Sequence, residues 1–315
     1  MKKSGALTVS KTAIVRTTPT ISELIAQFIA SQDVRTSSKG LYGRTLKQYF
    51  NWLHGSGIQI QDVTRVEILR YKQEILDNGL SPLTVGSYLT VVRKFYEWAE
   101  GNKYYPNVAK GIKTPHRKQQ FRKQALTQTQ STALLEYYQS RAKRDYAIVN
   151  LLLRTGLRTI ETIRANVDDI TFKAGKRVLL VHGKGRDEKD NFVILTDKAN
   201  QSIADYLHTR GRVKSGEPLF ISTSNNSRGD RLTTRTISYI AKEGLKAIGL
   251  DGKEFTAHSL RHTTAVNILR QGGTIEDAQG VLRHSSPATT QIYTATIKEE
   301  LRLKHAPEEL LDSVY

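Results

Sequence analysis

Cysteine is absent from the 315 residues of this chain. Without thiols it can form neither disulfides nor thiolate metal sites. No apolar run approaches the ~18 residues that a membrane span requires. The residues that follow Lys2 and Lys3 are too polar for a signal sequence. These absences predict a cytoplasmic protein without a membrane partner.

Acidic residues are few, with 30 Asp and Glu against 48 Lys and Arg and a net charge of +18. Such an excess attracts polyanions over long range, and nucleic acid is the commonest large polyanion. The charge therefore favours DNA binding and a nucleoid-associated location, although a ribosomal or merely basic protein would share it. The length accommodates two domains.

The N-terminal part is predicted to be helical. Residues 1–19 carry four basic residues and no acid, which is typical of a flexible basic tail. Capping boxes at Thr20–Glu23 and Thr64–Glu67 each begin a helix, and Ser81–Pro82 supplies an N-cap and a first-turn proline. With a further helix over about 39–54, residues 20–104 are expected to form a four-helix domain.

Residues 105–125 differ from their surroundings in charge. The segment from 110 to 124 has no acid and only two large apolar residues, so it should not pack as core and is expected to be an interdomain linker. It either follows a phosphate backbone or is a solvated tether. Its DNA-binding candidates are Lys110, Lys113, Arg117, Lys118, Arg122 and Lys123.

Residues 126–315 are expected to form a second domain, mainly α with a small antiparallel β-sheet. An apolar helix over 143–154 should lie at its centre. The β-rich segments 177–181 and 191–195 predict a hairpin. Further helices are expected at about 197–209, 233–248, 258–271, 275–282 and 287–296.

Three basic side chains are candidates for one anion site. His258 and Arg261 are three positions apart in a predicted helix and so share a face, although a surface histidine near a surface arginine is the commoner meaning of this pattern. Arg158 follows a glycine that ends the apolar helix, so it should be held rigidly. Glu161 could pair with Arg158 and orient it toward a phosphate.

Tyr293 is the candidate nucleophile. Ser286-Pro287 begins a helix, His284 lies just before it, and Tyr293 falls nearly two turns into that helix. Most of the 14 tyrosines are better explained as packing residues, and only this position separates Tyr293 from them.

The segments 155–161 (TGLRTIE), 258–262 (HSLRH) and 282–293 (LRHSS through TQIY) resemble, in order and spacing, the motifs of the tyrosine recombinase (phage integrase) family over about residues 20–300. The resemblance implies that residues 20–104 are the core-site DNA-binding domain and 126–315 the catalytic domain, together forming a C-shaped DNA clamp. The implied catalytic residues are Arg158, Lys184, His258, Arg261, His284 and the nucleophile Tyr293.

The chain departs from the family pattern at Arg283, where the family usually has glycine. This arginine is expected to alter a turn or to add a DNA contact. Lys184 shares its predicted hairpin turn with Arg186 and Lys189, which are the alternatives for the catalytic cation. His182 on the same hairpin is more typical of a structural residue.

The residue types suit phosphoryl transfer without a metal or other cofactor. Two guanidinium groups match the oxygens of a phosphodiester and keep their charge. Ionising a phenol at pH 7 costs roughly 4 kcal/mol, which nearby positive charge or a histidine base reduces. The sequence shows no carboxylate cluster or Cys/His set of metal-ligand type.

By resemblance, the function is site-specific recombination or integration through a 3′-phosphotyrosine and a Holliday junction, in a mobile genetic element. Four protomers would assemble on double-stranded DNA, and a monomer in solution and accessory proteins are compatible with this. The segment Pro307–Leu311 would dock on a neighbouring subunit or within its own chain. The alternatives are a type IB topoisomerase-like relaxase and a catalytically vestigial DNA-binding regulator.

Overall fold

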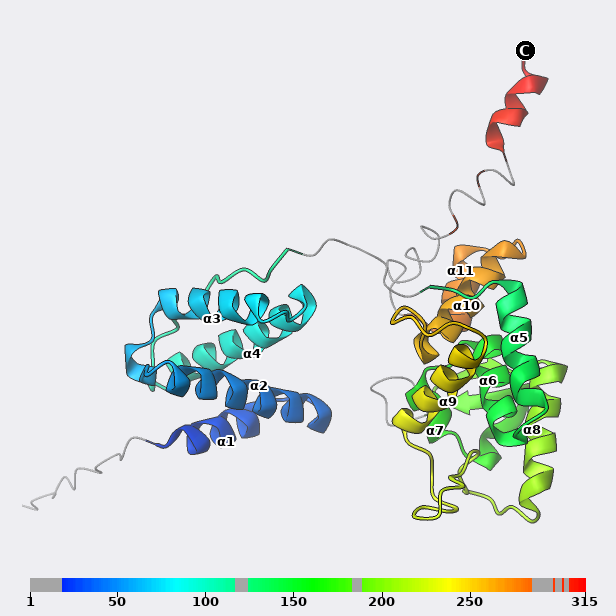
Figure 1. Cartoon of the computed structure of the whole chain (residues 1–315), viewed down its shortest axis with the longest axis horizontal. Coiled ribbons are helices and arrows are strands. Elements are labelled where there is room, and N and C mark those ends of the chain that lie inside the picture. Colours follow the sequence, from blue (N-terminus) through cyan, green and yellow to red (C-terminus); the bar gives the residue numbers. More distant parts are fainter. Residues whose placement is uncertain (1–18, 117–123, 183–188, 285–296, 298–301, 303–305) are drawn as a thin grey trace, which may run out of the picture. The chain divides into compact units, whose positions relative to one another are not determined.

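The computed structural model describes residues 19–116, 124–182, 189–284, 297, 302 and 306–315. The chain divides into two compact units, residues 1–119 and 120–315, each with its own hydrophobic core (Figure 1). Among the described residues, no helix combines the length and the apolar character needed to cross a bilayer.

The first unit is a helical bundle. Its elements are α1 (Ile21–Ser31), α2 (Thr36–Gly55), the 3₁₀ turn η1 (Ile60–Asp62), α3 (Arg65–Asp77) and α4 (Pro82–Gly101). Helix α2 packs on α1 and α4, and α4 packs on α3. The core is aromatic, and the buried hydroxyls of Tyr49 and Tyr96 share a hydrogen bond of 2.9 Å. The capping boxes of α1 and α3 form as the sequence predicts.

The expectation that residues 110–124 do not pack as core is wrong for the start of that segment. Ala109 and Ile112 are fully buried in the core of the bundle. Arg65 donates a hydrogen bond of 2.6 Å to the carbonyl of Lys110, and Arg93 one of 3.1 Å to that of Ile112. The side chains of Ala109 and Ile112, together with the backbone carbonyls, thus attach a basic segment whose lysines are exposed.

The second unit surrounds α6. Its elements are α5 (Gln128–Gln139), α6 (Lys143–Thr155), α7 (Thr159–Arg164), η2 (Val167–Asp169), β1 (Ile170–Lys173), β2 (Lys176–Val181), β3 (Asn191–Ile194), α8 (Asp197–Arg210), α9 (Thr234–Ala247), α10 (Ala257–Arg270), α11 (Ile275–Leu282) and η3 (Pro307–Ser313). Helix α6 contacts α5, α8, α9 and α10, as its apolar sequence predicts.

The sheet is antiparallel, with the order β1-β2-β3. Leu179 at its centre pairs with Ile170 of β1 and with Val193 of β3. The predicted hairpin is therefore confirmed, whereas β1 and the six-residue α7 were not predicted. The fold class is confirmed: the chain is mainly α, with an N-terminal helical domain followed in sequence by a domain that contains a small antiparallel sheet.

Candidate active site

Gly156 ends α6, and its conformation sets the direction of the turn that leads to Arg158. It is left-handed (φ 59°, ψ 27°), and its N–H donates to the carbonyl of Leu152 at 2.9 Å. A Cβ at this position would lie 2.5 Å from Cδ2 of Leu282 at the end of α11. Only glycine satisfies both the backbone conformation and the close approach, so α6 and α11 meet directly at this turn.

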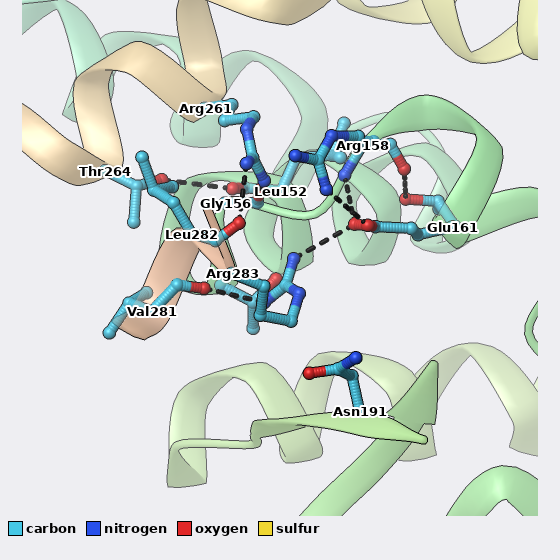
Figure 2. A network of polar contacts seen from close by, with 12 residues as sticks. Leu152, Gly156, Arg158, Glu161, Asn191, Arg261, Thr264, Val281, Leu282 and Arg283 are labelled. Atoms are coloured by element: carbon cyan, nitrogen blue, oxygen red, sulfur yellow. Dashed lines mark hydrogen bonds and ion pairs between the residues drawn. The ribbon is translucent and has the colours of Figure 1, made fainter. Parts of the chain in front are cut away.

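Arg158 lies two residues later, at the N-cap of α7, and is paired with Glu161. Its backbone N–H donates to Oε2 of Glu161 at 2.8 Å, and its Nη1 donates to Oε1 at 2.8 Å. The Glu161 side chain is 1% exposed, and that of Arg158 is 27% exposed. The predicted ion pair is therefore present. It holds the backbone and the guanidinium of Arg158 with one carboxylate (Figure 2).

Burial opposes ionisation of Glu161, but the charge of Arg283 and the hydrogen bonds from Arg158 outweigh it and lower the pKa of this carboxyl below its ordinary value. Glu161 is therefore an anion at neutral pH. It is held by two guanidinium groups at once.

Arg261 connects three helices. It lies on α10, is 2% exposed, and donates from Nη1 to the carbonyl of Gly156 and from Nη2 to the carbonyl of Leu282 at 2.6 Å. These carbonyls belong to the ends of α6 and α11, so they fix the plane of the guanidinium beside the turn that carries Arg158 (Figure 2).

His284 follows α11 in a Schellman motif. The N–H of Arg283 donates to the carbonyl of Gly280, and the N–H of His284 to that of Gln279, both at 3.1 Å. Burial and then the charges of Arg261, Arg158 and His258 lower the pKa of His284 to about 4. The imidazole is therefore neutral at pH 7.

His258 is exposed in the first turn of α10, one helical turn before Arg261. It lies near enough to His284 for its charge to contribute to the lowered pKa of that imidazole. The structure thus brings together the side chains of Arg158, His258, Arg261 and His284. They come from three segments that are up to 126 positions apart, as the numbering shows.

The sequence led us to expect that Arg283 alters a turn or adds a DNA contact, and in the structure it lies in the turn after α11 with its side chain on Glu161. Its side chain is 9% exposed and points inward, with Nη2 at 3.0 Å from Oε2 of Glu161. Its backbone is left-handed (φ 55°, ψ 47°), so it forms the turn that glycine would form more easily. The positive φ of the turn was foreseeable from the family pattern, but the partner of the side chain was not.

The proposed nucleophile Tyr293 lies outside the described residues, as do Lys184 and Arg186. Lys189 is described, and its ammonium group donates to Asp169, which is 3% exposed. A lysine that neutralises a buried carboxylate is a poor candidate for a mobile proton donor, so the geometry disfavours Lys189 as the alternative to Lys184.

Of the DNA-binding candidates, Lys110 and Lys113 are exposed, and Lys72 donates to the carbonyl of Lys113 at 3.0 Å. Arg117, Lys118, Arg122 and Lys123 lie outside the described residues. Within the described ranges there is no group of three or more His, Cys, Asp or Glu residues that could hold a metal ion.

The cluster has the chemistry of a phosphodiester site. Two guanidinium groups fixed by a buried carboxylate and by helix-end carbonyls offer charge-assisted donors to non-bridging oxygens. A neutral imidazole beside them can exchange a proton during attack. Such a preorganised cluster stabilises the charge that accumulates as phosphorus becomes five-coordinate.

Two models of known protein families match parts of this chain. Residues 124–300 match the model of the phage integrase family, and residues 22–103 match the phage integrase N-terminal SAM-like domain. The tyrosine recombinase XerC of Caldanaerobacter subterraneus is 40% identical over 163 residues, 51% of this chain and 43% of that protein. The tyrosine recombinase XerC of Pelobacter propionicus is 32% identical over 260 residues, 80% of this chain and 82% of that protein.

A crystal structure of the XerH site-specific recombinase, bound to its palindromic difH substrate after cleavage, has the same fold. The TM-score is 0.71 at 20% identity, covering 92% of this chain and 85% of that one. The family models and the relative that is 32% identical place the chain in a class of DNA recombinases. The chain belongs to the phage integrase family of tyrosine recombinases, which are site-specific DNA recombinases.

Proposed function

We propose that this chain cleaves and rejoins DNA strands at a specific site through a 3′-phosphotyrosyl intermediate formed by Tyr293. The observation that carries the proposal is the convergence of Arg158, Arg261, His258 and His284 on one cluster. We further propose that it acts in a mobile genetic element, in a cytoplasmic, nucleoid-associated setting.

In this scheme the scissile phosphate lies against Arg158 and Arg261. The phenol oxygen of Tyr293 attacks phosphorus and the bond from phosphorus to the 5′-oxygen breaks. The phenolic proton passes to a histidine of the cluster acting as general base. The departing 5′-oxygen takes a proton from Lys184. A second 5′-hydroxyl then attacks the phosphotyrosine, so the strand is resealed without ATP.

The proposed assembly is a tetramer of this chain on two double-stranded DNA sites, which exchanges strands through a Holliday junction. Each protomer would close its helical domain and its catalytic domain around DNA as a C-shaped clamp, with the part of the 105–125 segment that follows Lys113 joining the two domains. The segment Pro307–Leu311 would contact the neighbouring protomer. Accessory proteins would act on this assembly from outside.

The test is covalent trapping on a nicked suicide duplex that carries the candidate recombination site. The wild-type chain is expected to form a protein–DNA adduct, also in excess EDTA, because no step requires a metal. Tyr293→Phe should form none while keeping its affinity for the duplex, since only the nucleophilic oxygen is removed. Adduct yield is measured on denaturing gels, and binding by fluorescence anisotropy.

Tyr315→Phe is the matched control. This tyrosine is also close to the C-terminus and is fully exposed, so its loss should leave the adduct intact. An adduct that persists in Tyr293→Phe, or one that disappears in Tyr315→Phe alone, would assign the nucleophile elsewhere.

A further inference from the structure

Arg283 occupies a position where its backbone conformation is unfavourable. It is one of the few non-glycine residues at positive φ (55°) among those described, and it caps α11 directly before His284. A glycine would form the same Schellman turn without the contact between Cβ and the following carbonyl. A bulky residue persists at such a position when its side chain makes a compensating contact.

That contact is with Glu161, which lies 122 positions earlier in the chain. Nη2 of Arg283 lies 3.0 Å from Oε2 of Glu161, and Nη1 donates to the carbonyl of Val281 at 2.6 Å. The same carboxylate holds the backbone and the guanidinium of Arg158. Figure 2 shows Glu161 between the two arginines, with Arg283 reaching it from the end of α11.

We propose that Arg283 is a positioning residue for DNA cleavage, acting through Glu161 on Arg158. It joins the N-cap of α7 to the turn that carries His284, and therefore fixes the separation between Arg158 and His284. This inference rests on the proposed function, in which both residues act on the scissile phosphate.

Charge adds a second part to this role. Glu161 carries one negative charge, and Arg283 shares it with Arg158. Were Arg283 replaced by a neutral residue, the whole carboxylate charge would act on Arg158. The attraction of Arg158 for a phosphate would then fall. Arg283 thus keeps Arg158 oriented by a carboxylate without leaving it neutralised.

The experiment compares Arg283→Met, Arg283→Lys and Arg283→Gly in the full chain. Single-turnover cleavage of the suicide duplex, duplex affinity and thermal stability are measured for each. We expect Arg283→Met to cleave roughly 10- to 100-fold more slowly at saturating DNA, the scale of a misplaced catalytic group. Arg283→Lys, which can still pair with Glu161, should recover most of the rate.

Arg283→Gly separates positioning from stability. It relieves the left-handed strain, so its thermal stability should fall less than that of Arg283→Met, yet its cleavage should be as slow. Arg164→Met, at the exposed end of α7, removes one surface charge and should cleave at the wild-type rate.

Arg283→Met and Arg283→Gly cleaving at the wild-type rate would overturn the inference, as would rates that follow thermal stability across all variants. A wild-type chain that forms no adduct would instead overturn the proposed function, and this inference with it. An adduct in the wild type, with Arg283 variants unaffected, removes the inference alone.

Discussion

His262 follows Arg261 on α10, and its side chain is fully buried. Burial and then the nearby His258 lower the pKa of His262 to about 4, against an ordinary value of 6.5. Between pH 4 and pH 6.5, the imidazole of His262 therefore binds a proton in the unfolded chain but stays neutral in the folded chain. The stability that His262 contributes is complete above pH 6.5 and is lost as the pH falls toward 4. His284 acts in the same direction.

We expect the free energy of unfolding of the second unit to fall by about 3 kcal/mol between pH 7 and pH 4 through His262. Chemical denaturation at a series of pH values measures it. His262→Gln should reduce this dependence without abolishing it, because His284 still titrates in the same direction. A wild-type stability that stays level from pH 7 to pH 4.5 would contradict the expectation.

At the scale of residues, the sequence is most informative where chemistry restricts the residue type. Arg158, Arg261, His258 and His284 were selected because order and spacing single them out, and their catalytic roles stay predictions. The pairing of Arg283 with Glu161 was not predicted. Which of several arginines reaches a buried carboxylate depends on tertiary packing that periodicity does not contain.

At the scale of elements, helix starts were well predicted because their signals are local. Thr20 and Thr64 form the capping boxes that their sequences indicate, and Ser81 caps α4. Strand β1 and helix α7 were missed, because four and six residues are too few to show a periodicity. Residues 105–113 were assigned to a linker because the segment is basic and has few large apolar residues, whereas their packing depends on backbone carbonyls and on Ala109 and Ile112.

The junction of α6 and α11 gives a prediction at this scale. Gly156→Ala should destabilise the second unit by about 2–4 kcal/mol, because it adds left-handed strain and a clash with Leu282. It should also slow cleavage by displacing Arg158 and Arg261. Thermal unfolding and suicide-duplex cleavage measure the two effects.

Gly175→Ala is the matched control, since Gly175 also has a positive φ (74°) but no atom would lie within 4 Å of its Cβ. It should show only the strain, with cleavage unchanged. Equal losses of stability and activity in the two variants would show that close packing at Gly156 does not position the site.

At the scale of the whole molecule, the net charge of +18 is expected to dominate the affinity for DNA. If the chain neutralises six to ten phosphates, its DNA affinity should fall roughly 10³- to 10⁵-fold between 50 and 200 mM salt. Anisotropy titrations at several salt concentrations give the slope of log affinity against log salt. A shallow slope would argue against extensive backbone contact.

Lys110 and Lys113 are exposed on backbone that Arg65 and Lys72 hold in place, so they can meet a phosphate without first becoming ordered. Replacing both with Gln should reduce the magnitude of the salt slope by about 2. Lys246→Gln, which removes a lysine that already pairs with Asp251, is the control and should leave the slope as it was. An unchanged slope in the double variant would exclude both lysines from the DNA interface.

Arg261 binds the carbonyls of Gly156 and Leu282 from a buried position. The group proposed to stabilise the reaction therefore also stabilises the fold, and replacing Arg261 is expected to lower the stability of the second unit as well as the cleavage rate. A well-folded but inactive form, for crystallising a synaptic complex or as a dominant-negative reagent, should be made by removing the hydroxyl of Tyr293. The guanidinium of Arg261 should be retained.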